Sequence, residues 1–151
     1  MSEDPVSDRV CTICRDRAEA WKLSQERFLG KAENELACFQ ERYKLKKARL
    51  MYSEHAGLRQ WQRAFSVSNI REAVIHGFPI YRYYDKKLKE VKIILMSYVK
   101  LQAMEYRPMH VVVGFHEQTP DLWTVITVYD PSTEKHWQWN DQFDQKVCFC
   151  D

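Results

Sequence analysis

The sequence predicts an α+β domain in which a helical N-terminal half packs on a four-stranded twisted antiparallel sheet. Residues 16–47 are rich in Ala, Glu, Lys, Arg, Gln and Leu and contain no proline, which is typical of a helix. After Pro79 the apolar residues recur at every second position, in runs of β-branched and aromatic residues joined by short polar connections. The length of 151 residues suits one compact domain.

The helical half is expected to hold three segments. Asp16–Lys47 forms one long helix, or two helices joined near Gly30, because glycine costs about 1 kcal/mol relative to alanine inside a helix. Ser53–Phe65 forms the next, and Asn69 begins a third that stops at Gly77. The apolar stripe of the first helix comprises Trp21, Phe28, Ala32, Phe39 and Tyr43.

Four strands are expected in the second half: Ile80–Tyr84, Val91–Tyr98, Met109–Phe115 and Trp123–Tyr129. Their short connections permit hairpins and not crossovers, so the sheet should be antiparallel. Strict alternation along the last strand places Thr124, Ile126 and Val128 on one face and Val125, Thr127 and Tyr129 on the other. His110, Thr127 and Tyr129 would then share the face opposite the helices.

Charge is unevenly distributed, although the formal net charge is only +2. Residues 55–115 carry ten Lys/Arg and four Asp/Glu, whereas residues 116–151 carry two Lys/Arg and seven Asp/Glu. A basic middle suits a phosphate-bearing partner such as RNA, or is simply a solvated face. Apolar runs fall short of the roughly 20 residues of a spanning helix, and the polar start lacks a secretory signal. We therefore expect a cytoplasmic protein without a membrane partner.

His55, Arg59 and Arg63 recur at every fourth position and would line one face of the second predicted helix. This grouping suits a phosphodiester, because guanidinium groups stabilise the charge that develops during cleavage while an imidazole moves a proton. The alternative is an ordinary exposed polar face. A second basic run, without acidic residues, either contacts RNA or forms a wet helix face; it comprises Arg42, Lys44, Lys46, Lys47 and Arg49.

His110 and Tyr129 are the second candidate site. If they meet on the sheet with Thr127, they form an acid–base pair beside a hydroxyl group. The alternative is a half-buried, hydrogen-bonded pair that belongs to the sheet. No glycine-rich phosphate loop is visible, so no catalytic cofactor is expected.

The cysteines form two close pairs, Cys11–Cys14 as CxxC and Cys148–Cys150 as CxC. Four thiolates from two such pairs can close one tetrahedral zinc site, which would be structural because no coordination position stays open. The alternatives are reduced thiols, or a disulfide within Cys11–Cys14. Cys38 lies in the apolar part of the long helix and is expected in the core.

The stretch from about Tyr52 to Trp137 resembles the bacterial domain-of-unknown-function family 4258. The resemblance rests on short motifs in a fixed order: His55-Ala56-x-x-Arg59 leading to Arg63, the helix Val67–Gly77, Met109-His110-Val111-Val112-Val113, and Val125-Ile126-Thr127-Val128-Tyr129-x-Pro131. That family is similar to the RelE-like and barnase-like ribonuclease toxins. The resemblance implies a RelE-like α+β core at residues 52–137. Residues 1–51, a helical extension with the CxxC pair, and residues 138–151, a tail with the CxC pair that is expected to pack back on the N-terminus, lie outside it.

The activity that the resemblance implies is cleavage of RNA by attack of its own 2′-hydroxyl, without a catalytic metal. His55 or His110 would act as general base or acid, Arg59 and Arg63 would stabilise the developing charge, and Tyr129 would position or donate. An antitoxin protein is the implied partner. The long helix and the cysteine pairs depart from the family pattern, so two alternatives stay open: a non-catalytic, zinc-stapled protein-interaction module, and an RNA-binding protein without catalysis.

Overall fold

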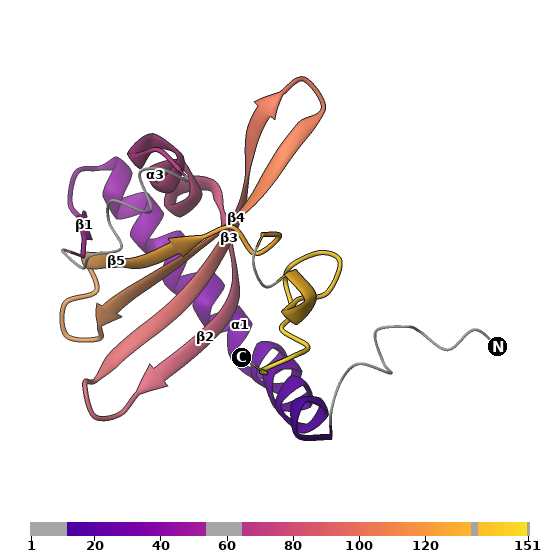
Figure 1. The fold of residues 1–151 in the computed structure, drawn as a ribbon. Coiled ribbons are helices and arrows are strands. Elements are labelled where there is room, and N and C mark those ends of the chain that lie inside the picture. Colours follow the sequence, from indigo (N-terminus) through magenta and orange to yellow (C-terminus); the bar gives the residue numbers. More distant parts are fainter. Residues whose placement is uncertain (1–11, 54–64, 134–135, 151) are drawn as a thin grey trace.

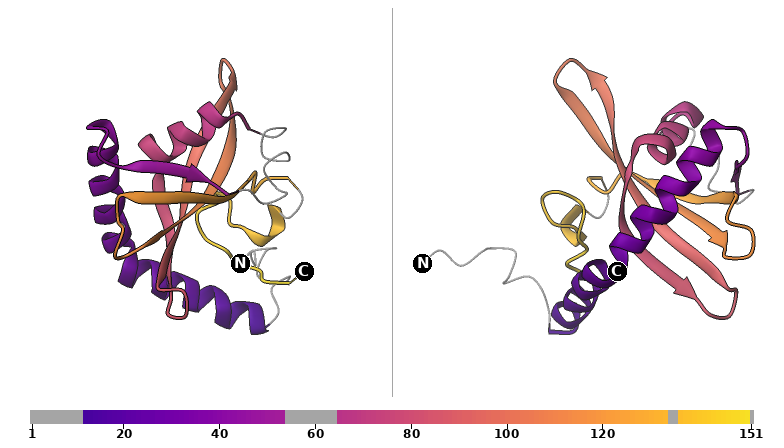
Figure 2. Two further views of the ribbon diagram at one scale, coloured as in Figure 1. Left: turned by 90° about the vertical axis from the view of Figure 1, so that its left-hand side faces the viewer. Right: turned by 180° about the vertical axis from the view of Figure 1, so that it is seen from behind.

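The computed structural model describes residues 12–53, 65–133 and 136–150. The elements in chain order are α1 (Thr12–Lys44), β1 (Arg49–Tyr52), α3 (Val67–His76), β2 (Phe78–Asp85), β3 (Glu90–Gln102), β4 (Glu105–His116), β5 (Leu122–Tyr129) and the short 3-10 helix η2 (His136–Gln138). Helices α1 and α3 lie on one side of the sheet, and residues 136–150, drawn in yellow, lie on the other (Figures 1 and 2). The helix predicted over Ser53–Phe65 falls almost entirely outside the described residues.

The sheet has five strands in the order β1-β5-β4-β3-β2. The predicted hairpins are present, because β2, β3, β4 and β5 pair antiparallel with their neighbours. The prediction of a four-stranded, wholly antiparallel sheet is wrong, since β1 adds a fifth strand that runs parallel to β5. The fold is therefore α+β with a mixed sheet.

The unpredicted strand follows directly from the way α1 ends. The amide of Lys47 donates to the carbonyl of Arg42, the amide of Lys46 donates to that of Tyr43, and Lys46 has a φ of 61°. This is a Schellman motif with lysine at the left-handed position that usually holds glycine. The helix stops at Lys44, so the basic run Arg42–Arg49 is divided between a helix end, a turn and a strand.

Helix α1 is continuous through Gly30, and its axis bends between its indigo and purple parts in Figure 2. Helix α3 begins earlier than predicted. Ser66 is its N-cap and Asn69 is the third residue, and the two exchange side-chain-to-backbone hydrogen bonds as a capping box. Gly77 ends the helix as expected, although its φ is −73° and not left-handed.

The main core lies between the helices and the sheet. Ala32, Leu36 and Phe39 of α1 pack there with alternate residues of the central strands, including Val91, Ile93, Leu95, Met109, Val111, Val113 and Phe115. Two predictions for α1 are wrong, because Phe28 is 37% exposed and Cys38 is exposed rather than in the core. No helix among the described residues is long and apolar enough to cross a membrane.

Alternation along β5 is interrupted by a bulge. Val112 pairs with Thr127 and Val113 pairs with Val125, so Ile126 is the extra residue. Val125 and Val128 consequently both face the core, against the prediction of strict alternation. The bulge leaves Tyr129 directly opposite His110 on the far side of the sheet.

The β3–β4 hairpin projects beyond the rest of the sheet (Figure 1, orange). The pairing of β3 with β2 ends at Met96, and the pairing of β4 with β5 ends at His110. Past these points, within the described residues, β3 and β4 pair only with each other. The projecting part exposes four large apolar side chains, Tyr98, Leu101, Met104 and Tyr106.

Candidate functional site

The structure brings together some of the predicted site residues. His110 and Tyr129 meet on the sheet, and Cys14, Cys148 and Cys150 meet at the start of α1. His55, Arg59, Arg63 and Cys11 lie outside the described residues. The basic run from Arg42 to Arg49 lies at the end of α1 and the start of β1.

His110 is fully buried, with 0% of its surface exposed. Its Nε2 lies 2.6 Å from the carbonyl oxygen of Phe143, and its Nδ1 lies 3.3 Å from the hydroxyl oxygen of Tyr129. A carbonyl oxygen can only accept, so Nε2 carries the hydrogen, and in the neutral ring Nδ1 accepts from the Tyr129 hydroxyl. Both ring nitrogens are therefore engaged inside the protein.

Burial decides the protonation state of this pair. It lowers the pKa of His110 to about 4, although the hydrogen bond to Phe143 and the charges of Asp130 and Asp144 act in the opposite direction. Burial also raises the pKa of Tyr129 far above its ordinary value. At neutral pH the pair is an uncharged, hydrogen-bonded part of the sheet, and neither group is ready to exchange a proton with a substrate.

Residues 136–150, here called the C-terminal strap, cover His110. The ring of Trp139 contacts the His110 ring edge-on, with centroids 4.5 Å apart. The strap turns tightly because the Asn140 side chain accepts from the amides of Asp144 and Gln145. Phe143 lies in this turn with a φ of 59°, an unusual value for a bulky residue, and its carbonyl reaches His110.

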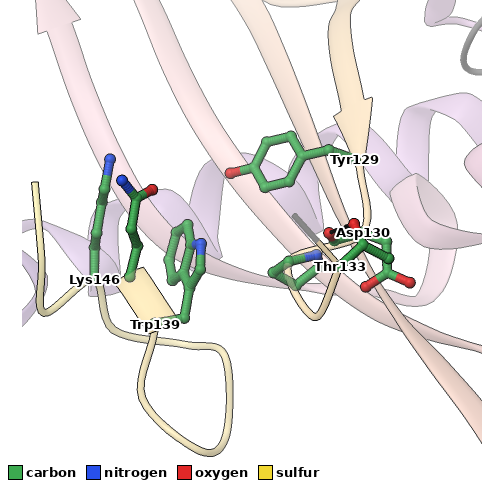
Figure 3. Close-up of a pocket in the computed structure, with 7 residues that line it drawn as sticks. Tyr129, Asp130, Thr133, Trp139 and Lys146 are labelled. Atoms are coloured by element: carbon green, nitrogen blue, oxygen red, sulfur yellow. Dashed lines mark hydrogen bonds between the residues drawn. The ribbon is translucent and has the colours of Figure 1, made fainter. Parts of the chain in front are cut away.

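A pocket of about 360 Å³ opens between the end of β5 and the strap (Figure 3). Its walls are formed by Tyr129, Asp130, Pro131, Thr133, Gln138, Trp139 and Lys146. The buried Asp130 carboxylate accepts from Arg107 at 2.5 Å and from the Ser132 hydroxyl at 2.6 Å. The Gln138 amide donates to the carbonyl of Cys150. These polar groups stabilise the wall of the pocket, and their hydrogen bonds are directed within the protein.

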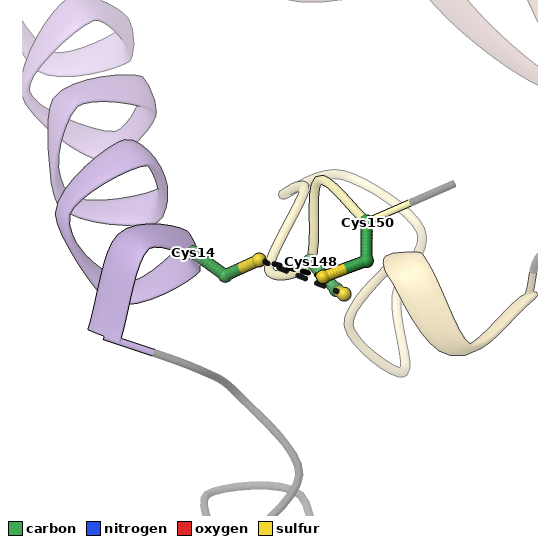
Figure 4. A group of neighbouring side chains, drawn as sticks. All are labelled: Cys14, Cys148 and Cys150. Carbon is green, nitrogen blue, oxygen red and sulfur yellow. Dashed lines mark hydrogen bonds between the residues drawn. The ribbon is translucent and has the colours of Figure 1, made fainter.

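Three cysteines gather where the strap reaches the start of α1 (Figure 4). The Sγ atom of Cys14 lies 3.9 Å from that of Cys148 and 3.4 Å from that of Cys150, and all three lie within 4.8 Å of one another. Four sulfurs around a tetrahedral zinc ion, each about 2.3 Å from it, are about 3.8 Å apart. The donor atoms and their spacing therefore suit a metal ion such as zinc.

The surroundings of the cluster also suit thiolates. Cys14 and Cys148 are 2% and 6% exposed, and the backbone amide of Phe149 donates to the Cys14 sulfur at 3.3 Å. Hydrogen bonds of this kind orient metal ligands and stabilise their charge. Among the described cysteines no disulfide is formed.

The basic run is exposed at the end of the molecule where α1 meets β1. Lys44, Lys46, Lys47 and Arg49 are all exposed, and among the described residues none of them forms an ion pair. Arg42 differs, because it holds Asp121 through two hydrogen bonds of 2.6 and 2.8 Å, which raise the pKa of Arg42. Four of the five predicted cations therefore face solvent, and the fifth links α1 to the residue just before β5.

Two contacts that hold the pocket wall and the strap in place could not be predicted from the sequence. Arg107 lies 4.5 Å above the ring of Phe65 while it holds Asp130, so it joins the start of the α3 segment to the end of β5. The Gln25 amide of α1 donates to the carbonyls of Ile80 and Asp144, which ties β2 and the strap to the helix. Both are long-range contacts of residue types that are common on surfaces.

Comparison with known proteins identifies one match. The family model described as "Domain of unknown function (DUF4258)" matches residues 52–130, which is just over half of the chain. The matched region holds α3 and strands β2 to β5, together with the segment that contains His55, Arg59 and Arg63, and it begins at the last residue of β1. Searches of the curated proteins and of the solved structures found no match.

Proposed function

This chain belongs to the DUF4258 family, and on that premise we propose that it acts on RNA as a metal-independent endoribonuclease of the toxin kind. The proposal rests on the likeness of the family to RelE-like and barnase-like ribonucleases. The observation that carries it is the exposed basic run next to the His55 segment. Residues 42–71 hold eight Lys/Arg and one Asp/Glu, and Lys44, Lys46, Lys47 and Arg49 face solvent. Such a surface suits the phosphate backbone of RNA.

The described residues that flank the His55 segment support a role for it beside β5. The amide of Ser53 donates to the carbonyl of Val125, and Phe65 lies under the Arg107 side chain that holds Asp130. The two described residues that flank the segment, Ser53 and Phe65, therefore lie near β5. In this proposal His55 takes the proton from the RNA 2′-hydroxyl, the freed oxygen attacks the neighbouring phosphorus, and Arg59 and Arg63 stabilise the charge.

His110 has a different role in the proposal. It is buried and neutral, and both of its nitrogens are hydrogen-bonded to protein groups, so we assign proton transfer to His55. His110 and Tyr129 stabilise the sheet, and His110 binds the strap through the Phe143 carbonyl and the Trp139 ring. Attack of the 2′-oxygen breaks the bond between phosphorus and the 5′-oxygen, which takes a proton from water, and the proton taken by His55 returns to the solvent. The products are a 2′,3′-cyclic phosphate and a 5′-hydroxyl end.

Cleavage of a labelled RNA, followed by gel electrophoresis and end-group analysis, tests the proposal. The protein should cleave RNA but not its 2′-O-methyl analogue. His55→Ala should lose roughly a hundredfold or more in rate, in the range typical of a lost acid–base group. The matched control is His76→Gln, an exposed histidine on α3 that should retain the wild-type rate. If the purified wild-type protein leaves every RNA intact, the ribonuclease proposal is abandoned.

A binding role without catalysis is the second candidate. The projecting β3–β4 hairpin and Trp137 favour it, because exposed large apolar side chains are typical of interaction surfaces. Trp139 does not add to this surface, since it packs on His110. This role requires a stable complex, with an antitoxin-type protein or with RNA, that comigrates in size-exclusion chromatography while no RNA is cleaved.

The cysteine cluster supports a separate proposal of a structural zinc ion. Cys14, Cys148 and Cys150 supply three thiolates at suitable distances, and the CxxC spacing offers Cys11 as the fourth ligand. A closed site of four thiolates adds stability and takes no part in RNA cleavage.

Metal analysis of protein purified without added zinc tests this site. It should find about one equivalent of zinc, which Cys148→Ser should lose. Cys38→Ser is the matched control, because Cys38 is exposed on α1 outside the cluster, and it should keep the metal. Wild-type protein that contains no metal under reducing conditions would contradict the zinc proposal.

A further inference from the structure

The C-terminal strap covers the second face of the sheet but is held by few backbone hydrogen bonds. Its only bridge within the described residues joins Trp139 to Lys146 of the strap itself. The backbone contacts between the described strap and the body of the protein include the Phe143 carbonyl on His110, the Asp144 carbonyl on Gln25 and the Phe149 amide on the Cys14 sulfur. A segment with so few protected hydrogen bonds opens at low free-energy cost unless something else fastens it.

The strap is also fastened at the start of α1. Trp21 stacks on Tyr81 of β2 with centroids 3.8 Å apart, and its ring meets those of Trp139 and Phe149 at 5.7 and 6.4 Å. Beside Phe149 stand the three thiols, of which Cys14 belongs to α1 whereas Cys148 and Cys150 belong to the strap. A bond across the cluster therefore joins two segments that are more than 130 residues apart in the chain.

We propose that the cysteine cluster is a latch that holds the strap closed over His110 and Tyr129. In its metal-bound form the latch rests on the zinc site proposed above. Removal of the metal under reducing conditions removes the bonds across the cluster, and leaves the strap its contacts with His110, Tyr129, Gln25 and Trp21 and the hydrogen bond from the Phe149 amide to Cys14. The strap then opens and exposes the buried face of the sheet, while the core between the sheet and α1 stays folded.

Oxidation gives the latch a second closed form. The Sγ atoms of Cys14 and Cys150 are 3.4 Å apart and need to approach by about 1.4 Å to reach disulfide length. With hydrogen peroxide as oxidant, two S–H bonds and one O–O bond break, one S–S bond forms, and two water molecules are released. A disulfide from Cys14 to the strap closes it, whereas a disulfide between Cys148 and Cys150 lies within the strap and leaves it open.

Hydrogen–deuterium exchange of the full-length wild-type protein, read by mass spectrometry of peptides, tests the latch. Peptides from residues 138–150 are compared with core peptides from 91–96 and 109–113. Addition of a zinc chelator and a reductant should accelerate exchange in the strap by at least about tenfold and leave the core peptides unchanged. Hydrogen peroxide added to the chelated protein should restore protection, with a Cys14–Cys148 or Cys14–Cys150 disulfide seen by peptide mapping.

Two variants sharpen the test. The double variant Cys11→Ser/Cys14→Ser should show an open strap without chelator, and peroxide should not close it, because the start of α1 then offers no thiol and Cys148 and Cys150 can pair only with each other. Cys38→Ser should behave as the wild type at every step. Since the chelated wild-type protein carries no substitution, the test does not depend on the folding of a variant.

The outcomes separate the latch from the zinc proposal. Metal that is present, but whose removal leaves strap exchange unchanged, overturns the latch and leaves the zinc site intact. A protein that contains no metal, yet closes and opens its strap through a Cys14 disulfide, overturns the zinc site and supports the latch. Unchanged strap exchange in both the reduced metal-free and the oxidised protein overturns the latch in both forms.

Discussion

Replacement of His110 by glutamine should change how stability depends on pH. The unfolded chain binds a proton at His110 near pH 6.5, whereas burial lowers the pKa in the folded protein to about 4. Above pH 6.5 the imidazole is neutral in both states and contributes its full stabilisation. As the pH falls from 6.5 toward 4, only the unfolded state gains the proton, so the free energy of unfolding decreases.

The size of the effect follows from the difference between the two pKa values. That difference corresponds to about 3 kcal/mol when the pH has passed below both values. Between pH 7.5 and 4.5 the wild-type protein should lose about 2–3 kcal/mol more stability than His110→Gln, which keeps a hydrogen-bond donor but does not titrate. The carboxylates and thiols titrate in both proteins, so their contributions cancel in the comparison.

Urea unfolding followed by circular dichroism at several pH values measures this difference. The control is His116→Gln, which removes an imidazole that is 54% exposed at the end of β4 and is not covered by the strap. Parallel stability–pH curves for the wild type and His110→Gln would refute the reasoning. They would mean that the imidazole titrates with an ordinary pKa in the folded protein.

Three further tests of the fold use the same unfolding measurement. Gly77→Ala should lower the free energy of unfolding by about 2–3 kcal/mol, because the added Cβ would lie 2.2 Å from the Ala73 carbonyl oxygen. Gly30→Ala is the matched control. Its added Cβ meets nothing within 4 Å, so it should raise the free energy of unfolding by up to about 1 kcal/mol. Lys46→Gly should raise the free energy of unfolding by about 1 kcal/mol. The residue at the end of α1 has a left-handed backbone conformation, which glycine adopts with less strain than lysine. Arg82→Met should cost about 2–3 kcal/mol because it leaves Glu35 without its partner, and the double variant with Glu35→Met should recover much of that loss. No loss for Gly77→Ala, no gain for Lys46→Gly, or equal costs for the single and double methionine variants would each contradict the packing described.

The sequence was sufficient to predict the main elements because their patterns are local. Alternating apolar residues identified all four hairpin strands, and proline-free composition identified α1. Strand β1 was not predicted because it has only four residues and because Lys46, not glycine, ends the helix before it. The bulge at Ile126 was also not predicted, since a single extra residue turns Val125 toward the core without changing the composition of the strand.

The candidate sites were predictable to different degrees. The thiol cluster followed from two cysteine pairs, because the preference of thiolates for a shared metal does not depend on how far apart the pairs are in the chain. The pairing of His110 with Tyr129 followed from alternation. The burial of that pair beneath the strap could not be predicted. It depends on Phe143 and Trp139, which contact the sheet although they lie in a segment that follows the last strand.

The account depends most on a neutral His110 that is sealed beneath the strap. Nitrogen-15 NMR of the imidazole in the reduced, metal-loaded protein measures this directly. We expect a slowly exchanging Nε2–H proton and an unprotonated Nδ1, both unchanged between pH 8 and about pH 5. An imidazole that titrates near pH 6.5 and exchanges its proton rapidly with water would contradict the account, and would return His110 to the list of groups able to transfer a proton to RNA.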